Sequence, residues 1–303
     1  RIRERGRSKR EEGKMARVAF AISCLEKRLR GQERSCPFCG NRETRFLQRK
    51  HFILELRRCP SCELLFRWPK DTPADNSAFY QEAYQEGSVT ARLSEEEIER
   101  LRHSNFQGTP WELGYRLEPL RALVPGGKVL DYGSSWGYLT DQLNRAGYDA
   151  VGWEPSRPRV DYGRKMLDVP IESDWARVED RGPFDGILCI HVLEHVPTPA
   201  EAFARFSRIL APGGWLVVYV PNGGGKNARE EGARWGPMIG EKHCLALHAP
   251  FFERNLVRFG FEPPRFASDP YAKPIKLVSW DGAEGRLEGD ELLVVARRGP
   301  KEA

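Results

Sequence analysis

The sequence predicts an α/β protein in which a doubly wound parallel sheet follows a small module built on four cysteines. Two observations carry this prediction. From residue 127 onward, short apolar segments alternate with helical segments, which is the pattern of a parallel sheet with helices on both faces. Before that region, two C-x-x-C pairs lie in a stretch too short to bury a sizeable core of its own.

Composition divides the chain into a basic extension (1–35), a cysteine module (36–73), a polar helical connector (74–119) and the α/β region (120–303). The extension holds 12 Lys or Arg and 5 Asp or Glu, a net charge of +7, whereas the whole chain carries +5. The remaining segments are therefore slightly acidic. Because nucleic-acid-binding domains present a broad basic surface, this distribution argues against a nucleic-acid partner.

The apolar segments do not predict a membrane span. The longest apolar run, residues 215–220, is far shorter than the roughly 20 residues that cross a bilayer. Residues 18–25 follow basic residues as in an export signal, but charged residues come next without a small-residue cleavage site. We therefore expect a helix there and a cytoplasmic protein, in which cysteines stay reduced.

The cysteine module predicts a metal site. Cys36 and Cys39 form the first pair and Cys59 and Cys62 the second, with 19 residues between the pairs. This spacing is typical of two knuckles that converge on one tetrahedral zinc ion. Redox catalysis is the alternative, but nothing beside the pairs resembles a thioredoxin-like βαβ unit. We predict a structural zinc ribbon with short strands between the pairs.

The remaining elements follow from hydrophobic periodicity. In the connector, residues 93–101 combine many charges with apolar residues at helical spacing, which predicts an exposed helix. The α/β region is predicted to contain strands at residues 128–131, 150–153, 169–171, 186–190, 215–220, 262–267 and 291–296, with helices that include 138–146, 199–210 and 250–259.

A ligand pocket is expected where the first of these α/β strands ends. Gly133 allows a sharp turn and close approach of a ligand, and Gly137 allows the following helix to pack against the strand. Glu154 ends the second strand, 21 residues after Gly133, where doubly wound folds place a carboxylate on a ribose. A tight turn and a solvated strand-end glutamate are the structural alternatives.

Four segments resemble the ordered motifs of class I S-adenosylmethionine-dependent methyltransferases: VLDYGSSWG, GWEPS, FDGILCIHVLEHVPTP and LAPGGWLVVYVPN. The resemblance covers residues 127 to about 298. It implies a Rossmann-like sheet of seven strands, the last antiparallel. The cysteine module similarly resembles the amino-terminal ribbon of many bacterial methyltransferases. A nicotinamide-dependent dehydrogenase would instead favour G-x-G-x-x-G after the first strand, which is absent.

The resemblance also implies roles for individual residues. One departure is Ser135, which replaces the middle glycine of the common first motif. The family pattern implies Asp131 and Gly133 at the methionine end of the cofactor, Glu154 at the ribose, Ser173 and Asp174 beside the adenine, and Ile190 and His191 in the methyl-transfer pocket.

Methyl transfer from a sulfonium mainly requires an oriented acceptor, and a base is needed when the acceptor is a hydroxyl. His191, His195 and His243 are the candidate catalytic residues. For Glu194 and His195 the structural alternative is a role in holding the start of the next helix. We predict His243 as the base because it follows the fifth α/β strand, outside the carboxyl end of the sheet.

The sequence therefore predicts an enzyme that methylates a small-molecule or glycan-linked sugar acceptor, with a hydroxyl as the expected target. Two alternatives remain open. One is an RNA methyltransferase that docks through the ribbon and the basic extension, and the other is a non-catalytic protein that binds S-adenosylmethionine.

Overall fold

The computed structural model describes residues 15, 18–78, 81, 91–271, 273–283 and 285–300. The predicted basic extension and connector are thus described only in part, because residues 1–14, 16–17, 79–80 and 82–90 lie outside this set.

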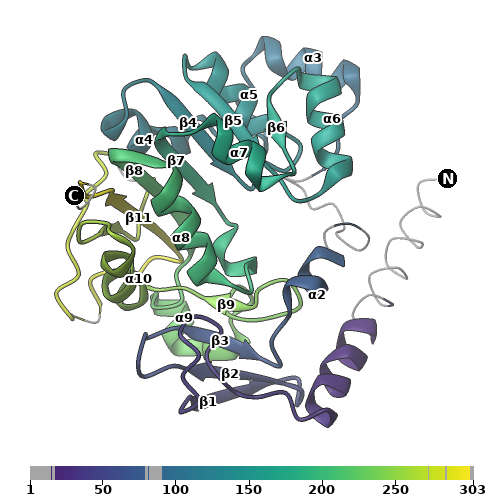
Figure 1. Cartoon of the computed structure of the whole chain (residues 1–303), viewed down its shortest axis with the longest axis vertical. Coiled ribbons are helices and arrows are strands. Elements are labelled where there is room, and N and C mark those ends of the chain that lie inside the picture. Colours follow the sequence, from purple (N-terminus) through teal and green to yellow (C-terminus); the bar gives the residue numbers. More distant parts are fainter. Residues whose placement is uncertain are drawn as a thin grey trace.

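The α/β region forms a seven-stranded sheet in the order β10-β11-β8-β7-β4-β5-β6 (Figure 1). β4, β5, β6, β7 and β8 run parallel, and β11 is antiparallel to both β8 and β10. The predicted sheet with an antiparallel last strand is confirmed. The strands are β4 (Lys128–Tyr132), β5 (Asp149–Trp153), β6 (Ile171–Glu172), β7 (Phe184–Ile190), β8 (Leu210–Pro221), β10 (Arg265–Ala267) and β11 (Glu291–Arg297).

Helices cover both faces of this sheet (Figure 1). In β8, Leu216 and Val218 belong to one apolar cluster and Val217 to the cluster on the opposite face, so the strand is buried on both sides. The helices are α2 (Pro73–Ala78), α3 (Glu95–His103), α4 (Glu118–Leu123), α5 (Tyr138–Arg145), α6 (Arg157–Leu167), α7 (Trp175–Arg181), α8 (Pro199–Ile209), α9 (Lys226–Glu231) and α10 (Ala249–Leu256).

The predicted connector helix is present as α3. Ser94 caps its first turn, and the Glu97 side chain accepts from the Ser94 backbone, which completes a capping box. Ile98 and Leu101 are buried on its inner side. The charged, periodic segment therefore predicted the helix, and the structure adds that one side of it is packed against the protein.

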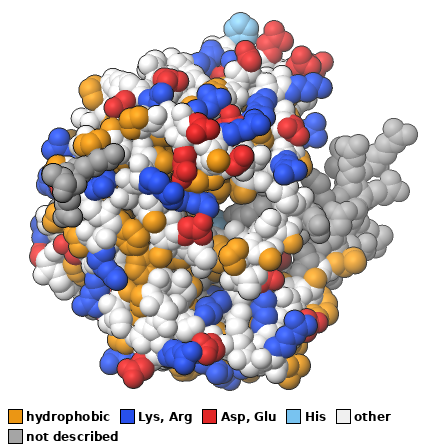
Figure 2. Space-filling view, viewed as in Figure 1, with side chains coloured by type: hydrophobic (Ala, Val, Ile, Leu, Met, Phe, Trp, Pro, Cys, Tyr) orange, Lys and Arg blue, Asp and Glu red, His pale blue; other side chains and the backbone are white. Residues whose placement is uncertain are grey.

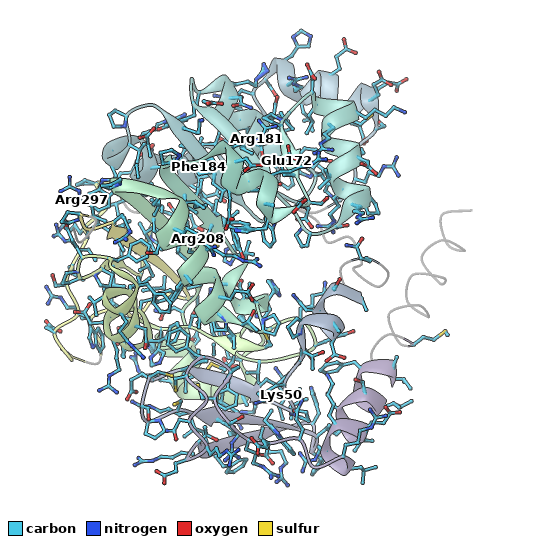
Figure 3. All side chains as sticks on the ribbon, in the orientation of Figure 1. Lys50, Glu172, Arg181, Phe184, Arg208 and Arg297 are labelled. Atoms are coloured by element: carbon cyan, nitrogen blue, oxygen red, sulfur yellow. The ribbon has the colours of Figure 1, made fainter. Side chains whose placement is uncertain are left out.

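The cysteine module forms a small antiparallel sheet of β1 (Arg45–Lys50), β2 (Leu54–Arg58) and β3 (Leu65–Trp68). A short strand of the α/β region, β9 (Leu245–Ala246), pairs with β3 and extends this sheet. Lys50 also donates to the Ile239 carbonyl at 2.7 Å (Figure 3). The ribbon and the large domain therefore share a sheet, which the sequence did not predict.

Residues 18–29 form the helix expected near the start of the chain. Its Cys24 is buried and Phe20 packs against an apolar cluster that also contains ribbon residues. Among the described residues, no helix combines the length and apolar character that crossing a bilayer would require.

Candidate active site

A cavity of about 460 Å³ opens at the carboxyl ends of β4, β5 and β7. Residues from α2 and from the loop before β9 close its other side, and the molecular surface is hollowed between the large domain and the ribbon (Figure 2). Ligands of open parallel sheets bind at this edge. The cavity holds two groups of polar side chains, here called the cofactor side and the acceptor side.

Glu154 lies on the cofactor side, where β5 ends, and is almost fully buried. Its carboxylate accepts hydrogen bonds from the backbone N–H groups of Ser135 and Ser156, each at 3.0 Å. Burial raises the pKa of Glu154, while these two donors and nearby Arg159 oppose the rise. The backbone thus fixes the carboxylate at the cavity wall.

Asp131 is buried at the end of β4 and accepts from the Thr140 hydroxyl at 2.7 Å. Burial raises the pKa of Asp131 to about 7, and the nearby charge of Glu154 contributes to the rise. A cationic group bound beside it, such as an ammonium, would favour the ionised carboxylate.

The turn between β4 and α5 has the backbone that the sequence predicted. Gly133 has φ +86°, and a Cβ there would lie 2.3 Å from Val192. Gly137 has φ +90°, and a Cβ at this position would lie 2.7 Å from Ile171. Ser135 also adopts a positive φ of +52°, although it carries a side chain. The turn therefore keeps a glycine-like conformation at the position of the sequence departure.

Free donors lie on the same wall of the cavity. Trp153 stacks on Tyr132 with ring centroids 4.4 Å apart. Its Nε1 is buried and has no hydrogen-bond partner among the described residues, and the same is true of the Ser134 hydroxyl. A ligand with hydroxyl or carboxylate oxygens could satisfy these groups. The cofactor side therefore fits S-adenosylmethionine.

Ser173 and Asp174 follow β6 and are not among the residues that line the cavity. Asp174 instead caps helix α7 by accepting from the Ala176 backbone N–H at 3.0 Å. The preceding Glu172 is held by Arg181 at 2.9 Å (Figure 3). The carboxylates of Glu172 and Asp174 are thus engaged within the protein.

On the acceptor side, His191 follows Ile190 at the end of β7, and both line the cavity. His191 has φ +51° and contacts two carboxylates, Glu291 at 2.5 Å through Nε2 and Glu194 at 3.4 Å through Nδ1. Burial would lower the pKa of His191, but the two carboxylates outweigh burial and raise it to about 9. His191 is therefore a cation near neutral pH.

Glu194 is a buried carboxylate surrounded by histidines. Besides His191, His195 Nε2 lies 3.9 Å from it. Burial would raise the pKa of Glu194, but the adjacent histidines lower it. Helix α8 begins at Pro199, after the N-cap residue Thr198, and neither carboxylate oxygen of Glu194 has a hydrogen-bond partner among the described residues. Glu194 thus faces the histidine cluster and does not hold the start of that helix.

His195 and His243 come from different loops, yet their rings lie 4.8 Å apart, edge to face. His243 Nδ1 donates to the Pro237 carbonyl at 2.7 Å, and His195 Nδ1 donates to the Lys242 carbonyl at 2.9 Å. Burial lowers the pKa of His243, and neighbouring His195 lowers it further. A neutral His243 with its proton on Nδ1 keeps a lone pair on Nε2.

Three residues that support the acceptor side carried no usable signal in the sequence. Glu291 is the first residue of β11, and Arg116 precedes α4, yet they form an ion pair at 3.1 Å. Tyr271 bonds to both of them. These residues meet because β11 inserts beside β8 in the sheet. Finding them therefore requires the order in which the strands pair.

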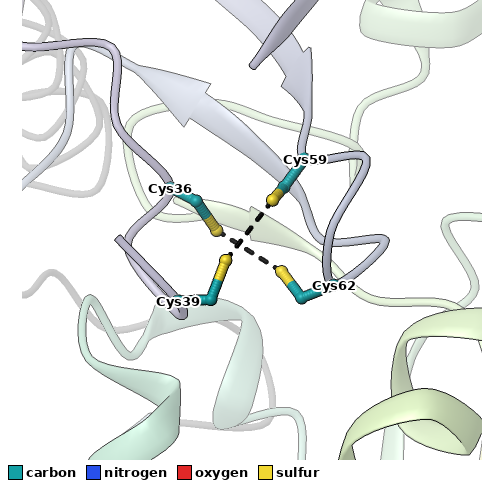
Figure 4. Close-up of side chains that lie close together, drawn as sticks. All are labelled: Cys36, Cys39, Cys59 and Cys62. Atoms are coloured by element: carbon teal, nitrogen blue, oxygen red, sulfur yellow. Dashed lines mark hydrogen bonds between the residues drawn. The ribbon is translucent and has the colours of Figure 1, made fainter. Parts of the chain in front are cut away.

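The four paired cysteines converge in space (Figure 4). Cys36 lies 3.5 Å from Cys62 and Cys39 lies 3.5 Å from Cys59, measured between sulfur atoms. These distances exclude a disulfide and approach the roughly 3.8 Å edge of a tetrahedron with metal–sulfur bonds of about 2.3 Å. The donor set and its arrangement therefore fit one zinc ion.

Comparison with known proteins supports the chemistry of the cavity. The family described as "Methyltransferase domain" matches residues 105–263, more than half of the chain. A ubiquinone biosynthesis O-methyltransferase of Thiobacillus denitrificans is 33% identical over 116 residues, which cover 35% of this chain and 50% of that protein. One from Nitrosococcus oceani is 33% identical and covers 44% of this chain and 58% of that protein. The chain spans about half the length of these relatives.

Among solved structures, a Burkholderia thailandensis 1,6-didemethyltoxoflavin-N1-methyltransferase with bound S-adenosylhomocysteine covers 85% of this chain and 99% of its own, at 15% identity and a TM-score of 0.45. The strand order of the sheet, the cavity at its carboxyl edge and the family match agree. The chain belongs to the family described as a methyltransferase domain.

Proposed function

We propose that the enzyme methylates a hydroxyl of a small-molecule or glycan-linked acceptor, with His243 as the general base. The observation that carries the proposal is the state of the His243 ring. Its Nδ1–H is held by the Pro237 carbonyl and its pKa is lowered by burial, so Nε2 keeps a lone pair on a residue that lines the cavity. The O-methyltransferase names of the relatives support an oxygen acceptor.

In this proposal, S-adenosylmethionine supplies an electrophilic methyl group. His243 Nε2 takes the hydroxyl proton as the acceptor oxygen bonds to the methyl carbon and the carbon–sulfur bond breaks. Cationic His191, held between Glu194 and Glu291, shapes the pocket and does not serve as a base near neutral pH. His195 packs against His243 and positions its ring.

For the cofactor side, we propose that Asp131 and the Gly133 backbone bind the methionine end, that Glu154 binds the ribose hydroxyls and that Ile190 lines the methyl-transfer pocket. Gly137 would allow the close approach of α5 to the sheet. Ser173 and Asp174 remain proposals for the adenine end. Domain limits at residues 35, 73 and 119 likewise remain proposals.

For the ribbon, we propose that Cys36, Cys39, Cys59 and Cys62 bind one structural zinc ion. The convergence of four thiols, three of them buried, supports this assignment. Zinc would also stabilise β3, the strand that pairs with β9.

The test begins with methyl-labelled S-adenosylmethionine and fractionated metabolite extracts, which identify an acceptor. Single-turnover transfer is then compared for His243→Ala, His195→Ala and His191→Ala. We expect His243→Ala to slow transfer by about 100- to 10,000-fold while cofactor affinity is kept. Full turnover by His243→Ala between about pH 6 and 9 would reject it as the base.

A further inference from the structure

The helix of residues 18–29 carries an apolar stripe that faces away from the protein. The stripe consists of Val18, Ile22, Leu25 and Leu29, with Met15 three residues before it in the sequence, and the alternating spacing of three and four residues is that of one side of a helix. Each of these side chains is exposed, from 46% for Leu25 to 87% for Leu29. Isolated exposed apolar residues are common, but a continuous row marks an interaction surface.

The opposite side of this helix is fixed to the ribbon. Cys24 is buried, the Lys27 ammonium lies 3.1 Å from Asp71, and Arg28 donates to the Ile53 carbonyl at 2.8 Å. Rotation of the helix to bury the stripe would break these contacts. The ribbon therefore holds the stripe outward.

One further exposed apolar side chain lies in the ribbon, beside a residue that the helix contacts. Phe52, in the turn between β1 and β2, is 90% exposed and precedes the residue that Arg28 contacts. In the space-filling view, hydrophobic side chains appear at the lower right edge, where Figure 1 places this helix (Figure 2). The ribbon thus also presents an exposed apolar side chain, in the turn that Arg28 contacts.

The stripe fits poorly to a second copy of the chain. It spans two heptads, whereas coiled coils sustain the pattern over at least about three and carry charges beside the seam. The flanking positions here are Ala19 and Ala21 in the first heptad and Glu26 and Arg28 in the second, and Arg28 is already engaged by the Ile53 carbonyl. Residues 1–17 hold eight Lys or Arg and three Asp or Glu, so pairing two copies would bring together two segments of net charge +5.

We propose that this helix docks the enzyme on an anionic phospholipid surface. The apolar stripe would enter the boundary between headgroups and acyl chains, as interfacial amphipathic helices do. The net charge of residues 1–17 complements the negative headgroups and adds electrostatic attraction that salt weakens. This inference does not depend on the identity of the methyl acceptor.

The test uses the full chain and vesicle flotation. Vesicles of equimolar phosphatidylglycerol and phosphatidylcholine are compared with vesicles of phosphatidylcholine alone. The variant Ile22→Gln/Leu25→Gln/Leu29→Gln removes the stripe but keeps good helix formers at exposed positions. Val257→Gln, at an exposed apolar position on the large domain, is the matched control.

We expect the wild-type chain and the control to bind the anionic vesicles, and the triple variant to bind them at least about 10-fold more weakly. Phosphatidylcholine alone should bind less, and added salt should reduce binding to the anionic vesicles. Absence of wild-type binding, or equal binding by the triple variant, overturns the proposal. A wild-type dimer that the triple variant dissociates, without vesicle binding, would assign the stripe to a second copy instead.

Discussion

The two sides of the cavity are built in different ways. The cofactor side comes from one continuous β-α-β stretch, in which Asp131 and Glu154 end neighbouring parallel strands. The acceptor side joins residues far apart in sequence, such as His191 and His243, and Glu291 holds His191 from behind the lining. The first arrangement depends on local strand and turn geometry, whereas the second depends on how distant elements pack.

The acceptor side also depends on the ribbon. Arg67 of β3 is buried, and its guanidinium donates to the carbonyls of Gly240 and Glu241, at 2.5 and 3.2 Å. Its backbone N–H donates to the Cys244 carbonyl at 2.9 Å. The loop that carries His243 is therefore held from both ends by one ribbon residue. Damage to the ribbon should affect the acceptor side before the cofactor side.

Metal removal should give the largest difference between the effects on the acceptor side and on the cofactor side. Chelation, or Cys59→Ser, removes the proposed zinc ion and should thereby unfold the ribbon and release the loop around His243. We expect one zinc per chain before treatment, a loss of methyl transfer of at least about 100-fold afterwards, and little change in S-adenosylmethionine affinity measured by calorimetry.

Cys24→Ala is the control, because Cys24 lies outside the four-cysteine cluster. Elemental analysis and thiol titration follow the metal. A metal-free protein with unchanged fold and unchanged transfer would show that the ribbon does not support the acceptor side.

Glu154→Ala should instead weaken the binding of S-adenosylmethionine and leave the ribbon intact. Loss of charge-assisted hydrogen bonds to the ribose is expected to weaken S-adenosylmethionine binding by about 1 to 3 kcal/mol. Zinc content should not change. The control is Asp149→Ala, at the exposed start of the same strand. If calorimetry gives both variants the same cofactor affinity, Glu154 does not bind the ribose.

The difference between local geometry and the packing of distant elements explains what could be predicted from the sequence. Strand periodicity and the turn residues Gly133 and Gly137 are local, and the sheet and the turn after β4 followed from them. The pairing of β9 with β3 left no signal, because β9 has only two residues and its partner lies far away in the chain. The contrast between cationic His191 and neutral His243 arises from carboxylates that only the tertiary fold supplies.

The cation on His191 should appear as a pH dependence of stability. Its pKa is raised from 6.5 to about 9, so its contribution is complete below pH 6.5 and is lost as the pH rises to about 9. The side chain is 35% exposed, so solvent screening limits this contribution to about 1 kcal/mol.

We expect His191→Asn to flatten the curve of unfolding free energy between these pH values, measured by urea denaturation. His103→Asn, at the exposed end of α3, serves as the control. Parallel curves for wild type and His191→Asn would show that the two carboxylates do not hold a proton on this ring.

The smallest effect is expected at the turn of the cofactor side, where Ser135 and Asp168 offer a matched pair. Both have a positive φ, +52° and +55°, so glycine relieves a similar backbone strain at each position while it increases the entropy of the unfolded chain. Asp168 is exposed at the end of α6, and we expect Asp168→Gly to raise the free energy of unfolding by about 0.5 kcal/mol. Ser135→Gly also loses the hydrogen bond that Arg159 donates to the Ser135 hydroxyl at 2.8 Å. This loss should offset the gain, so that the free energy of unfolding changes by less than about 0.5 kcal/mol. Urea denaturation of both variants measures the difference. If Ser135→Gly is the more stabilising of the two, the Arg159 hydrogen bond does not contribute to the stability of this turn.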